Sequence, residues 1–479
     1  MYMRFQLVVW LEVHLKLNSN HKLFCACANE QDFDMLEPNT HICPTCTAQP
    51  WALPVLQNDA LDLALRLGSA LWCTIQTESH FDRKSYFYPD LPNGYQITQY
   101  YQPTAIDWNL SFFVDNEFSE QKAVGIQDAH METDTGKTIH IDGEALLDYN
   151  RAGTPLVEIV TKPDFRKIDE VLWFCKELQR IARYNSISFA DMEKWQMRVD
   201  VNVSICEQDA KDFGTRIELK NLNSFAAIKR AIEHEYQRQI NLYMKWEPIQ
   251  QSTRWRDDQK WISYLMRSKE DALDYRYFPE PDLPTLFINE EQKVDYHAVL
   301  PSMLISDMKE KQWFNKEYIN WLISDVNIYN YYLYFVNSWF DPKVVAKRIV
   351  WPILSRINTK AITIDELPFT KSQFFSFLQV IWEWYIHNNQ LKLVMDKMLE
   401  TWENPNSIVE SQWFWQSDDI DYDYIITNVL ENNQDVVTQY KNGKTSTISF
   451  FIWQVMKASK WKADPNEIHK KLQKYLDNY

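Results

Sequence analysis

Glycine is scarce in this chain of 479 residues, which contains 8 glycines beside 20 tryptophans. Ordinary usage of about 7% would give roughly 34 glycines in a chain of this length. Glycine reaches positive φ without a Cβ clash, so tight turns and helix C-termini normally use it. Eight glycines are too few for a fold of this size. The two counts together make about 6% of the chain, which is close to ordinary glycine usage.

Long apolar runs are also missing. The apolar start of the chain, residues 5–13, is interrupted by Glu12 and followed by His14, so we expect neither a membrane span nor a signal peptide. Seven cysteines are an odd number, which argues against a disulfide framework and favours reduced thiols or a metal site in the cytoplasm. A formal net charge of -16 with 45% hydrophobic residues is typical of a globular chain with room for roughly three domains.

Hydrophobic periodicity divides the chain into two kinds of region. Before residue 293, segments that alternate in polarity are mixed with segments of helical spacing, whereas the later spacing is helical throughout. The alternating segments are 11–17, 110–114 and 198–205, and the helical ones are 58–71, 168–184, 225–243, 302–324, 343–357, 371–386 and 390–401. We therefore predict an α+β protein with a mixed or antiparallel β cradle domain at 1–292, a helical domain at 293–408 and a small helical tail domain at 409–479.

Two cysteine pairs, Cys25 with Cys27 and Cys43 with Cys46, occur close together. Each short pair can present two thiolates from one tight turn, so the two pairs can converge on one tetrahedral ion. We predict a structural zinc module at 25–46, in which His41 is near enough to be a further ligand. The competing interpretation is four free thiols that pack as small hydrophobes.

Acidic residues on short apolar strands form a second set of candidates. The period of two places Glu12 and His14 on one strand face, and it does the same for the polar residues of 130–134, including Glu132. Glu158 lies among apolar neighbours, and a carboxylate is rarely buried unless it is paired or binds a cation. If these four side chains converge, they form a site for Mg²⁺ that holds substrate phosphates. Surface salt bridges are the competing interpretation.

Basic and aromatic residues form a third set. Arginine and lysine beside tyrosine suit phosphate contact and the stacking of an unpaired base, although loop packing would use the same residues. In the tail, residues 457–474 hold six lysines against two acids, which indicates a phosphate-facing surface or a solvated helix face. The candidates are Arg83, Lys84, Tyr86, Tyr88, Lys137 and Arg151, and in the tail Lys457, Lys460 and Lys462.

Long unbroken motifs resemble one protein family. The segments FDRKSYFYPDLPNGYQITQ, DYNRAGTPLVEIV, GTRIELKNLNSF and MRSKEDALDYRYFPEPDLP resemble the B subunits of bacterial aspartyl/glutamyl-tRNA amidotransferases. The tail segment YKNGKTSTISFFIWQVMKASKWKADP resembles the tRNA-binding domain of the same family. The resemblance begins near residue 5, runs to the end of the chain and is strongest before residue 290.

The resemblance implies an activity, cofactors and partners. Members phosphorylate the side-chain carboxylate of misacylated tRNA with ATP, and ammonia from a separate glutaminase (A) subunit then forms the amide. A small C subunit completes the complex. The catalytic and Mg²⁺ residues would be Glu12, His14, Glu132 and Glu158, and the zinc ligands would be the four cysteines. The third set would bind ATP or the tRNA end, and the tail lysines would bind the tRNA body.

One departure from the family pattern favours an alternative function. Many relatives carry a second carboxylate at the position of Thr133, so the metal site here is one charge poorer unless Asp134 or a water substitutes. Together with the zinc-like module and the basic tail, this departure supports a non-catalytic tRNA-binding scaffold of the same complex.

The resemblance also offers an explanation for the missing glycines. Several tryptophans stand where relatives commonly carry glycine, and some bacterial lineages read the UGA codon as glycine where others read tryptophan. We hypothesise that the natural protein has glycine at many of these positions, whereas Trp173, inside a helix, is genuine. The positions are Trp10, Trp51, Trp195, Trp246, Trp261, Trp402, Trp453 and Trp461.

Overall fold

The computed structural model describes residues 5–208, 210, 212–257, 262–268, 275–294, 298–311, 314–360, 362–383, 388–412, 421–441, 447–459 and 465–478. The chain divides into two compact units, 1–316 and 317–479. The first unit combines sheet and helices and the second is helical, which confirms the α+β prediction. The finer domain limits of 292 and 408 stay predictions.

The largest sheet among the described residues has the strand order β14-β13-β12-β11-β1-β10-β7-β6-β2. Neighbouring strands are antiparallel except β12 and β13, which are parallel. Chain segments more than 100 residues apart therefore lie side by side at the centre of the sheet. The strands are β1 (Phe5–Lys16), β2 (Thr74–Ile75), β6 (Ala105–Phe113), β7 (Gln121–Thr133), β10 (Pro155–Thr161), β11 (Met197–Glu207), β12 (Ile217–Lys220), β13 (Ser252–Asp257) and β14 (Ile262–Ser268).

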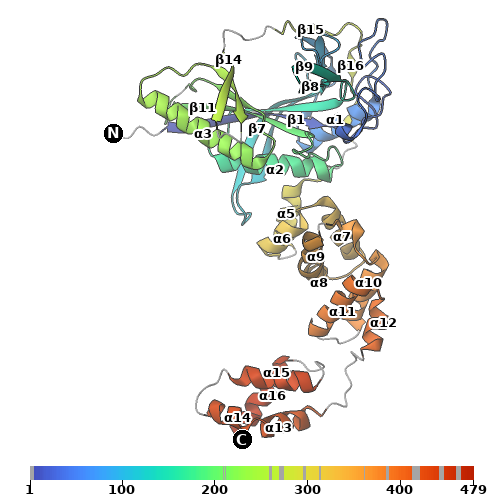
Figure 1. The fold of residues 1–479 in the computed structure, drawn as a ribbon, viewed down its shortest axis with the longest axis vertical. Coiled ribbons are helices and arrows are strands. Elements are labelled where there is room, and N and C mark those ends of the chain that lie inside the picture. Colours follow the sequence, from blue (N-terminus) through green and yellow to red (C-terminus); the bar gives the residue numbers. More distant parts are fainter. Residues whose placement is uncertain are drawn as a thin grey trace. The chain divides into compact units, whose positions relative to one another are not determined.

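The alternation of β1 separates an apolar face from a polar one. Leu11, Val13 and Leu15 are fully buried in the main core, whereas Glu12 and His14 face the other way. Helices α1 (Asn58–Ala70), α2 (Ile168–Tyr184) and α3 (Phe225–Met244) pack against the apolar face (Figure 1). The opposite face, which carries Glu12 and His14, is called the cradle face below.

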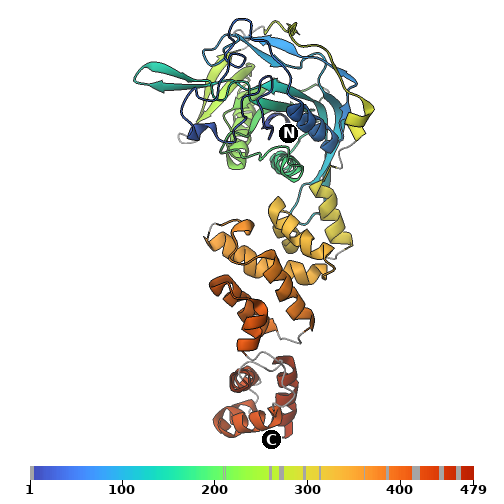
Figure 2. The same cartoon turned by 90° about the vertical axis from the view of Figure 1, so that its right-hand side faces the viewer.

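Short elements complete the first unit. A three-stranded sheet joins β15 (Phe278–Pro279), β4 (Asp82–Ser85) and β5 (Tyr95–Thr98), and β16 (Leu286–Phe287) pairs with β3 (Glu78–Ser79). The hairpin of β8 (Lys137–Ile141) and β9 (Glu144–Asp148) projects from this unit (Figure 2). The remaining elements are η1 (Phe33–Met35), α4 (Glu290–Val294) and α5 (Pro301–Glu310).

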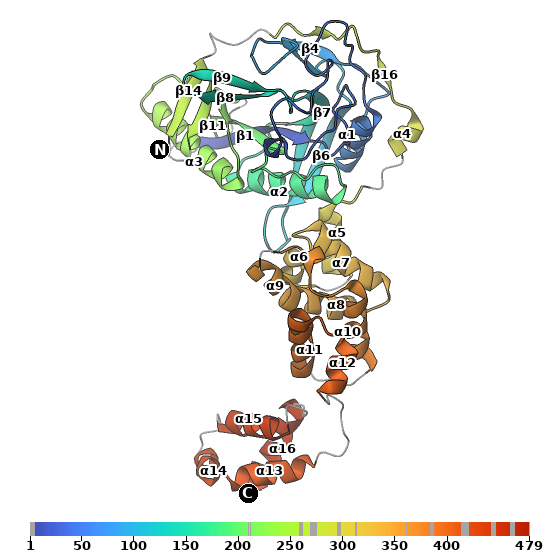
Figure 3. The same ribbon diagram turned by 45° about the vertical axis from the view of Figure 1, so that its right-hand side comes forward.

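The second unit is built from short helices, and α13 to α16 form a bundle with its own core (Figure 3). A π-helical turn that contains Pro352 interrupts the helix expected at 343–357. The segment expected at 302–324 consists of two helices, α5 and α6. The elements are α6 (Lys316–Leu322), α7 (Val326–Asn337), α8 (Pro342–Arg348), η3 (Ile349–Ile353), α9 (Leu354–Lys360), η4 (Ile364–Glu366), α10 (Lys371–Glu383), α11 (Asn388–Thr401), α12 (Pro405–Ser411), α13 (Tyr422–Glu431), α14 (Gln434–Lys441), α15 (Ile448–Ala458) and α16 (Pro465–Asn478).

None of the helices in the described part of the chain has the length and apolar character that a membrane span needs. The cytoplasmic location expected from the cysteine content stays a prediction.

Six tryptophans adopt the left-handed backbone conformation that glycine favours. Their φ angles lie between 58° and 71°, and four of them lie one or two positions after the last residue of helices α1, α3, α7 and α11. After α3, the Trp246 N–H donates to the Tyr243 carbonyl and the Glu247 N–H donates to the Leu242 carbonyl, a bond pattern that usually ends on glycine. The six residues are Trp51, Trp72, Trp195, Trp246, Trp339 and Trp402.

These angles support the glycine hypothesis at four of the positions named from the sequence, and they add Trp72 and Trp339. Trp10 and Trp453 are not among the positive-φ residues, and Trp261 and Trp461 lie outside the described residues. Trp173 lies within α2, where the Lys176 ammonium is 4.8 Å from its ring centroid, and its identity stays a prediction.

Candidate active site

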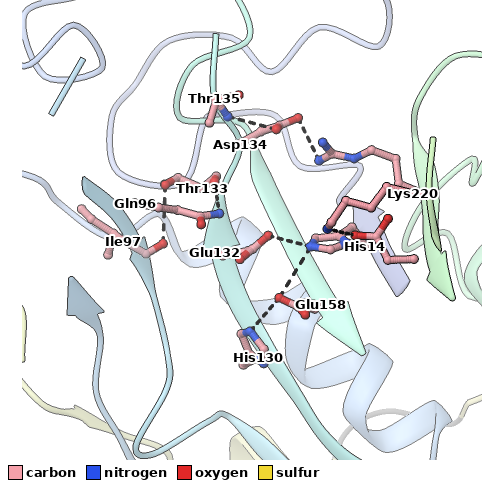
Figure 4. A network of polar contacts seen from close by, with 12 residues as sticks. His14, Gln96, Ile97, His130, Glu132, Thr133, Asp134, Thr135, Glu158 and Lys220 are labelled. Atoms are coloured by element: carbon pink, nitrogen blue, oxygen red, sulfur yellow. Dashed lines mark hydrogen bonds and ion pairs between the residues drawn. The ribbon is translucent and has the colours of Figure 1, made fainter. Parts of the chain in front are cut away.

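Three strands bring two carboxylates and an imidazole together on the cradle face. His14 on β1 lies opposite Glu158 on β10, and Glu132 projects from β7 beside them (Figure 4). The His14 Nε2 atom is 3.2 Å from Glu132 Oε1 and 3.5 Å from Glu158 Oε2. We call His14, Glu132 and Glu158 the primary cluster. The sheet register, which pairs residues far apart in sequence, creates it.

A second imidazole holds Glu158 from the other side. The His130 Nε2 atom is 3.2 Å from Glu158 Oε2, and the His130 Nδ1 atom is 2.7 Å from Asp128 Oδ1. His130 pairs with Glu158 across β7 and β10, so the same register positions both imidazoles. The alternation of residues 130–134 predicts that His130 lies on this strand face, but no sequence signal assigns a role to His130 or to Asp128.

The charges of the cluster depend on one another. Burial lowers the pKa of His14, but the carboxylates of Glu158 and Glu132 outweigh burial and raise that pKa above its ordinary value. Burial opposes the charge of His130 in the same way, yet Glu158 and Asp128 raise its pKa to about 10. Burial acts to raise the pKa of Glu158, but His14, His130 and Lys84 hold it well below its ordinary value. The Glu158 carboxylate is therefore ionised at neutral pH.

The donor set fits a divalent cation. Ligand atoms in the octahedral shell of Mg²⁺ lie about 2.1 Å from the ion and hence about 3 Å from one another, close to the separations found here. The three candidate ligand atoms all lie within 4.8 Å of one another. Glu132 is only 2% exposed, and its Oε2 atom has no hydrogen-bond partner among the described residues. A buried carboxylate oxygen without a partner is the feature that a bound cation would satisfy.

Glu12 belongs to a different group from the one the sequence predicted. Glu12 pairs with Asp200 across β1 and β11. Carboxylate oxygens of Glu12, Asp200 and Glu218 of β12 all lie within 4.8 Å of one another. The Lys220 ammonium lies 2.5 Å from Asp200 Oδ2 and 3.0 Å from Glu218 Oε1, so a cation already neutralises part of this second cluster. Burial, together with Glu158 and Glu218, raises the pKa of Glu12. Alternation in the segment RVDVNVS was the signal that could have identified Asp200.

Thr133 does not remove a ligand from the primary cluster. Residues on a strand alternate between faces, so Thr133 points away from Glu132 and toward β5, where its hydroxyl lies 3.5 Å from the Ile97 carbonyl oxygen (Figure 4). Asp134, the suggested substitute, is ion-paired at 3.1 Å with Arg198 and at 3.5 Å with Arg151. The departure at Thr133 therefore gives little support to a non-catalytic role.

The four cysteines predicted to bind zinc converge. Their Sγ atoms all lie within 4.8 Å of one another, and a tetrahedral zinc with bonds of about 2.3 Å needs sulfurs about 3.8 Å apart. The buried Lys22 ammonium donates to the His41 carbonyl at 2.8 Å and lies 3.6 Å from Cys46 Sγ. We call the four cysteines the thiol module. The His41 imidazole is not part of this group and lies 3.7 Å from Glu30.

The basic and aromatic candidates are divided among different surroundings. Lys84 lies near the primary cluster, because Glu132 and Glu158 raise its pKa even though burial acts to lower it. Arg83, on the other face of β4, pairs with Glu280 at 2.6 and 2.7 Å and with Asp282 at 3.1 Å, which leaves its charge compensated. Lys137 pairs with Asp34 at 2.6 Å on the projecting hairpin. Arg151 donates to the carbonyls of Thr135 and Gly136.

The tail lysines are only partly described. Lys457 on α15 is exposed and places its ammonium 5.2 Å from the ring centroid of Trp453. Lys460 and Lys462 lie outside the described residues. Their role in binding a tRNA body stays a prediction.

A mostly antiparallel sheet that carries the primary cluster, together with the thiol module, indicates a domain with candidate metal sites of two kinds. A family model described as the GatB/GatE catalytic domain matches residues 7–293, and a GatB domain model matches residues 330–476. The chain therefore belongs to the GatB/GatE family.

Relatives resemble the chain over nearly their whole length. A protein from Elusimicrobium minutum is 40% identical, covering 98% of this chain and 99% of its own. One from Persephonella marina is 38% identical, covering 99% of this chain and 100% of its own. Both carry the name of the B subunit of an aspartyl/glutamyl-tRNA(Asn/Gln) amidotransferase.

Proposed function

We propose that this chain is the subunit of a tRNA-dependent amidotransferase that phosphorylates the side-chain carboxylate of Glu-tRNA(Gln) or Asp-tRNA(Asn) with ATP and converts it to the amide. The ammonia would come from a partner glutaminase (A) subunit, with a small C subunit completing the complex. The observation that carries the proposal is the primary cluster, with its buried and unpartnered Glu132 Oε2 atom. Membership of the GatB/GatE family supports this chemistry for the cluster.

The proposed chemistry has two steps. An oxygen of the substrate carboxylate attacks the γ-phosphorus of ATP, the bond from that phosphorus to the bridging oxygen breaks, and ADP leaves. Ammonia then attacks the acyl carbon, the bond from carbon to phosphate oxygen breaks, and the departing phosphate takes up the proton that the nitrogen loses. Most of the catalysis is positioning and charge stabilisation, because ATP provides the leaving group. Lys84, beside Glu132 and Glu158, is placed to hold the anionic groups that the two steps bring together.

Mg²⁺ fits the primary cluster and zinc fits the thiol module. His14, Glu132 and Glu158 would hold Mg²⁺, and when bound the ion stabilises the charge of the transferring phosphoryl group. His130, held by Asp128, orients the Glu158 carboxylate toward this position. The four cysteines would form a closed zinc site, which stabilises the fold and has no open position for chemistry.

Substituting Glu158 by glutamine tests the proposal. Glu158→Gln keeps the side-chain shape but removes one negative charge from the cluster, so we expect formation of the phosphorylated intermediate to fall at least about 100-fold. Binding of the misacylated tRNA should change less than about twofold. Glu144→Gln, at an exposed position of the β8–β9 hairpin, is the matched control. Amidation retained by Glu158→Gln would refute the role assigned to Glu158.

A non-catalytic scaffold would give a different result in the same complex. It would bind misacylated tRNA but show no ATP hydrolysis stimulated by that tRNA. The absence of this stimulated hydrolysis from the reconstituted wild-type complex would favour the scaffold.

A further inference from the structure

Six tyrosines from three chain segments form a continuous arc near the primary cluster. Ring centroids are separated by 5.9 Å for Tyr88 and Tyr86, 6.0 Å for Tyr86 and Tyr275, and 6.0 Å for Tyr275 and Tyr277. The arc continues through a parallel stack of Tyr277 and Tyr100 at 4.0 Å and an edge contact of Tyr100 with Tyr101 at 5.1 Å. We call Tyr86, Tyr88, Tyr100, Tyr101, Tyr275 and Tyr277 the tyrosine arc.

The inner part of the arc lies beside the primary cluster. The chain at 275–279 runs along β4, where the Ser85 N–H donates to the Tyr275 carbonyl, and the Lys84 ammonium is 5.2 Å from the Tyr275 ring centroid. Burial raises the pKa of Tyr277 to about 12, the nearby Lys84 ammonium opposes that rise and the Glu158 carboxylate adds to it, so Tyr277 lies within electrostatic reach of the cluster. An aromatic surface therefore leads up to the carboxylates.

The outer part of the arc is exposed, and the backbone of two of its residues is anchored by hydrogen bonds. Tyr88, Tyr100 and Tyr101 are between 56% and 58% exposed. The N–H groups of Tyr100 and Tyr101 both donate to the Oδ2 atom of the fully buried Asp82, at 2.8 and 3.0 Å. These bonds anchor the backbone that carries the two rings, and the Tyr101 hydroxyl donates to the Tyr277 carbonyl at 3.3 Å, which reduces the ordering cost of a ligand that stacks on them.

We propose that the tyrosine arc is the stacking surface for the unpaired 3′-terminal adenosine of the aminoacyl-tRNA, which positions the attached amino acid at the primary cluster. This inference rests on the proposed function. Aromatic rings bind single-stranded nucleic acid because every base has a face that can stack. The ring of Tyr100 is covered on one side by Tyr277 and is more than half exposed, so it is open to a base.

An adenine base could also come from ATP, and the openness of the arc distinguishes the two sources. Small-molecule sites usually bury 70–90% of their ligand, whereas the outer arc is an open surface. The end of a large RNA must approach from solvent and reach inward, which is the direction in which the arc runs. These features favour the tRNA end.

Kinetics of the complex reconstituted with its partner subunits test the proposal. Tyr100→Ala should raise KM for the misacylated tRNA about 10- to 100-fold, from the usual strength of base stacking, and leave KM for ATP unchanged. Tyr100→Phe keeps the ring face and should behave like the wild type. A rise in the KM for ATP alone, equal losses in both variants, or no change in Tyr100→Ala would overturn the proposal.

A binding measurement without ATP separates this inference from the proposed function. An uncharged tRNA that carries 2-aminopurine as its terminal base should lose fluorescence when it binds, because stacking quenches that base. Tyr100→Ala should restore the fluorescence while Tyr100→Phe keeps it quenched, with thermal unfolding of both variants as the folding control. Absence of quenching with the bound wild-type complex would refute the stacking role but not the phosphorylation. Quenching without phosphorylation would refute the proposed function and leave the stacking surface in place.

Discussion

The thiol module and the primary cluster are both candidate metal centres, but the chain assembles them differently. The thiol module comes from one segment of 22 residues, so its ligands are close in sequence before the protein folds. The primary cluster comes from β1, β7 and β10, and its ligands meet only when the sheet register is complete. The thiols suit zinc in a closed shell, whereas the carboxylates suit a hard cation that keeps positions for phosphate.

This difference separates stability from chemistry. A local metal module can stabilise a loop-rich segment that has few regular elements of its own. A cluster that depends on the folded sheet can instead be precise in geometry, which the proposed positioning of ATP and substrate requires. Loss of each metal should therefore change a different observable.

The largest expected effect is on the thiol module. Cys25→Ser should lower the melting temperature of the protein by about 6–12 °C, since loss of a zinc ligand costs on the order of 3 kcal/mol and each kcal/mol shifts Tm by about 2–4 °C. A zinc chelator should have the same effect on the wild type but little further effect on the variant. Cys73→Ser is the matched control, because Cys73 lies outside the thiol module but is buried to the same degree, at 7% exposed against 8% for Cys25.

Removal of Mg²⁺ should give the opposite pattern, with ATP hydrolysis lost and the melting temperature nearly unchanged. Differential scanning calorimetry and an ATPase assay on the same samples measure both quantities. Equal destabilisation of Cys25→Ser and Cys73→Ser, with no chelator effect in either, would contradict a structural zinc.

A smaller effect is expected at the support of Glu158. Asp128→Asn weakens the ion pair with His130, the residue that orients Glu158. The Mg²⁺ concentration for half-maximal ATP hydrolysis should therefore rise about 10- to 100-fold. The melting temperature should remain that of the control Asp142→Asn, an exposed residue of the β8–β9 turn. An unchanged Mg²⁺ requirement would show that Asp128 does not position the cluster.

The smallest effect concerns turns that border the two regions. Trp51 follows the thiol module and Trp195 precedes β11, and both have positive φ with exposed side chains. A bulky residue in the left-handed region costs roughly 1–2 kcal/mol, so Trp51→Gly and Trp195→Gly should each stabilise the protein by about 1 kcal/mol in urea titrations. Trp173→Gly, inside α2, should destabilise it by a similar amount.

Peptide mass spectrometry of the natural protein checks the residue identity directly. The hypothesis expects glycine at positions 51, 72, 195, 246, 339 and 402. Finding tryptophan at positions 246 and 339 of the natural protein would refute the glycine hypothesis.

Much of the fold was predictable because local signals agreed with tertiary packing. The helix expected at 168–184 has those limits in α2, and the alternation of β1 correctly placed Glu12 and His14 on the polar face. The convergence of the four cysteines was predictable for the same reason, since their spacing is local.

The division between the two carboxylate clusters could not be read from the sequence. It depends on which strand lies on each side of β1, since Glu12 faces Asp200 on β11 while His14 faces Glu158 on β10. Strand order is a long-range property that alternation does not encode. The engagement of Arg83 by Glu280 was hidden in the same way, because the two residues are 197 positions apart.

Anomalous diffraction from crystals of the protein with Mn²⁺ and a non-hydrolysable ATP analogue tests the central claim most directly. Mn²⁺ replaces Mg²⁺ at oxygen-rich sites and also accepts an imidazole ligand. We predict an anomalous peak in contact with His14 Nε2, Glu132 and Glu158, next to the phosphates of the analogue. A peak confined to Glu12, Asp200 and Glu218, or the absence of any peak on the cradle face, would contradict the account.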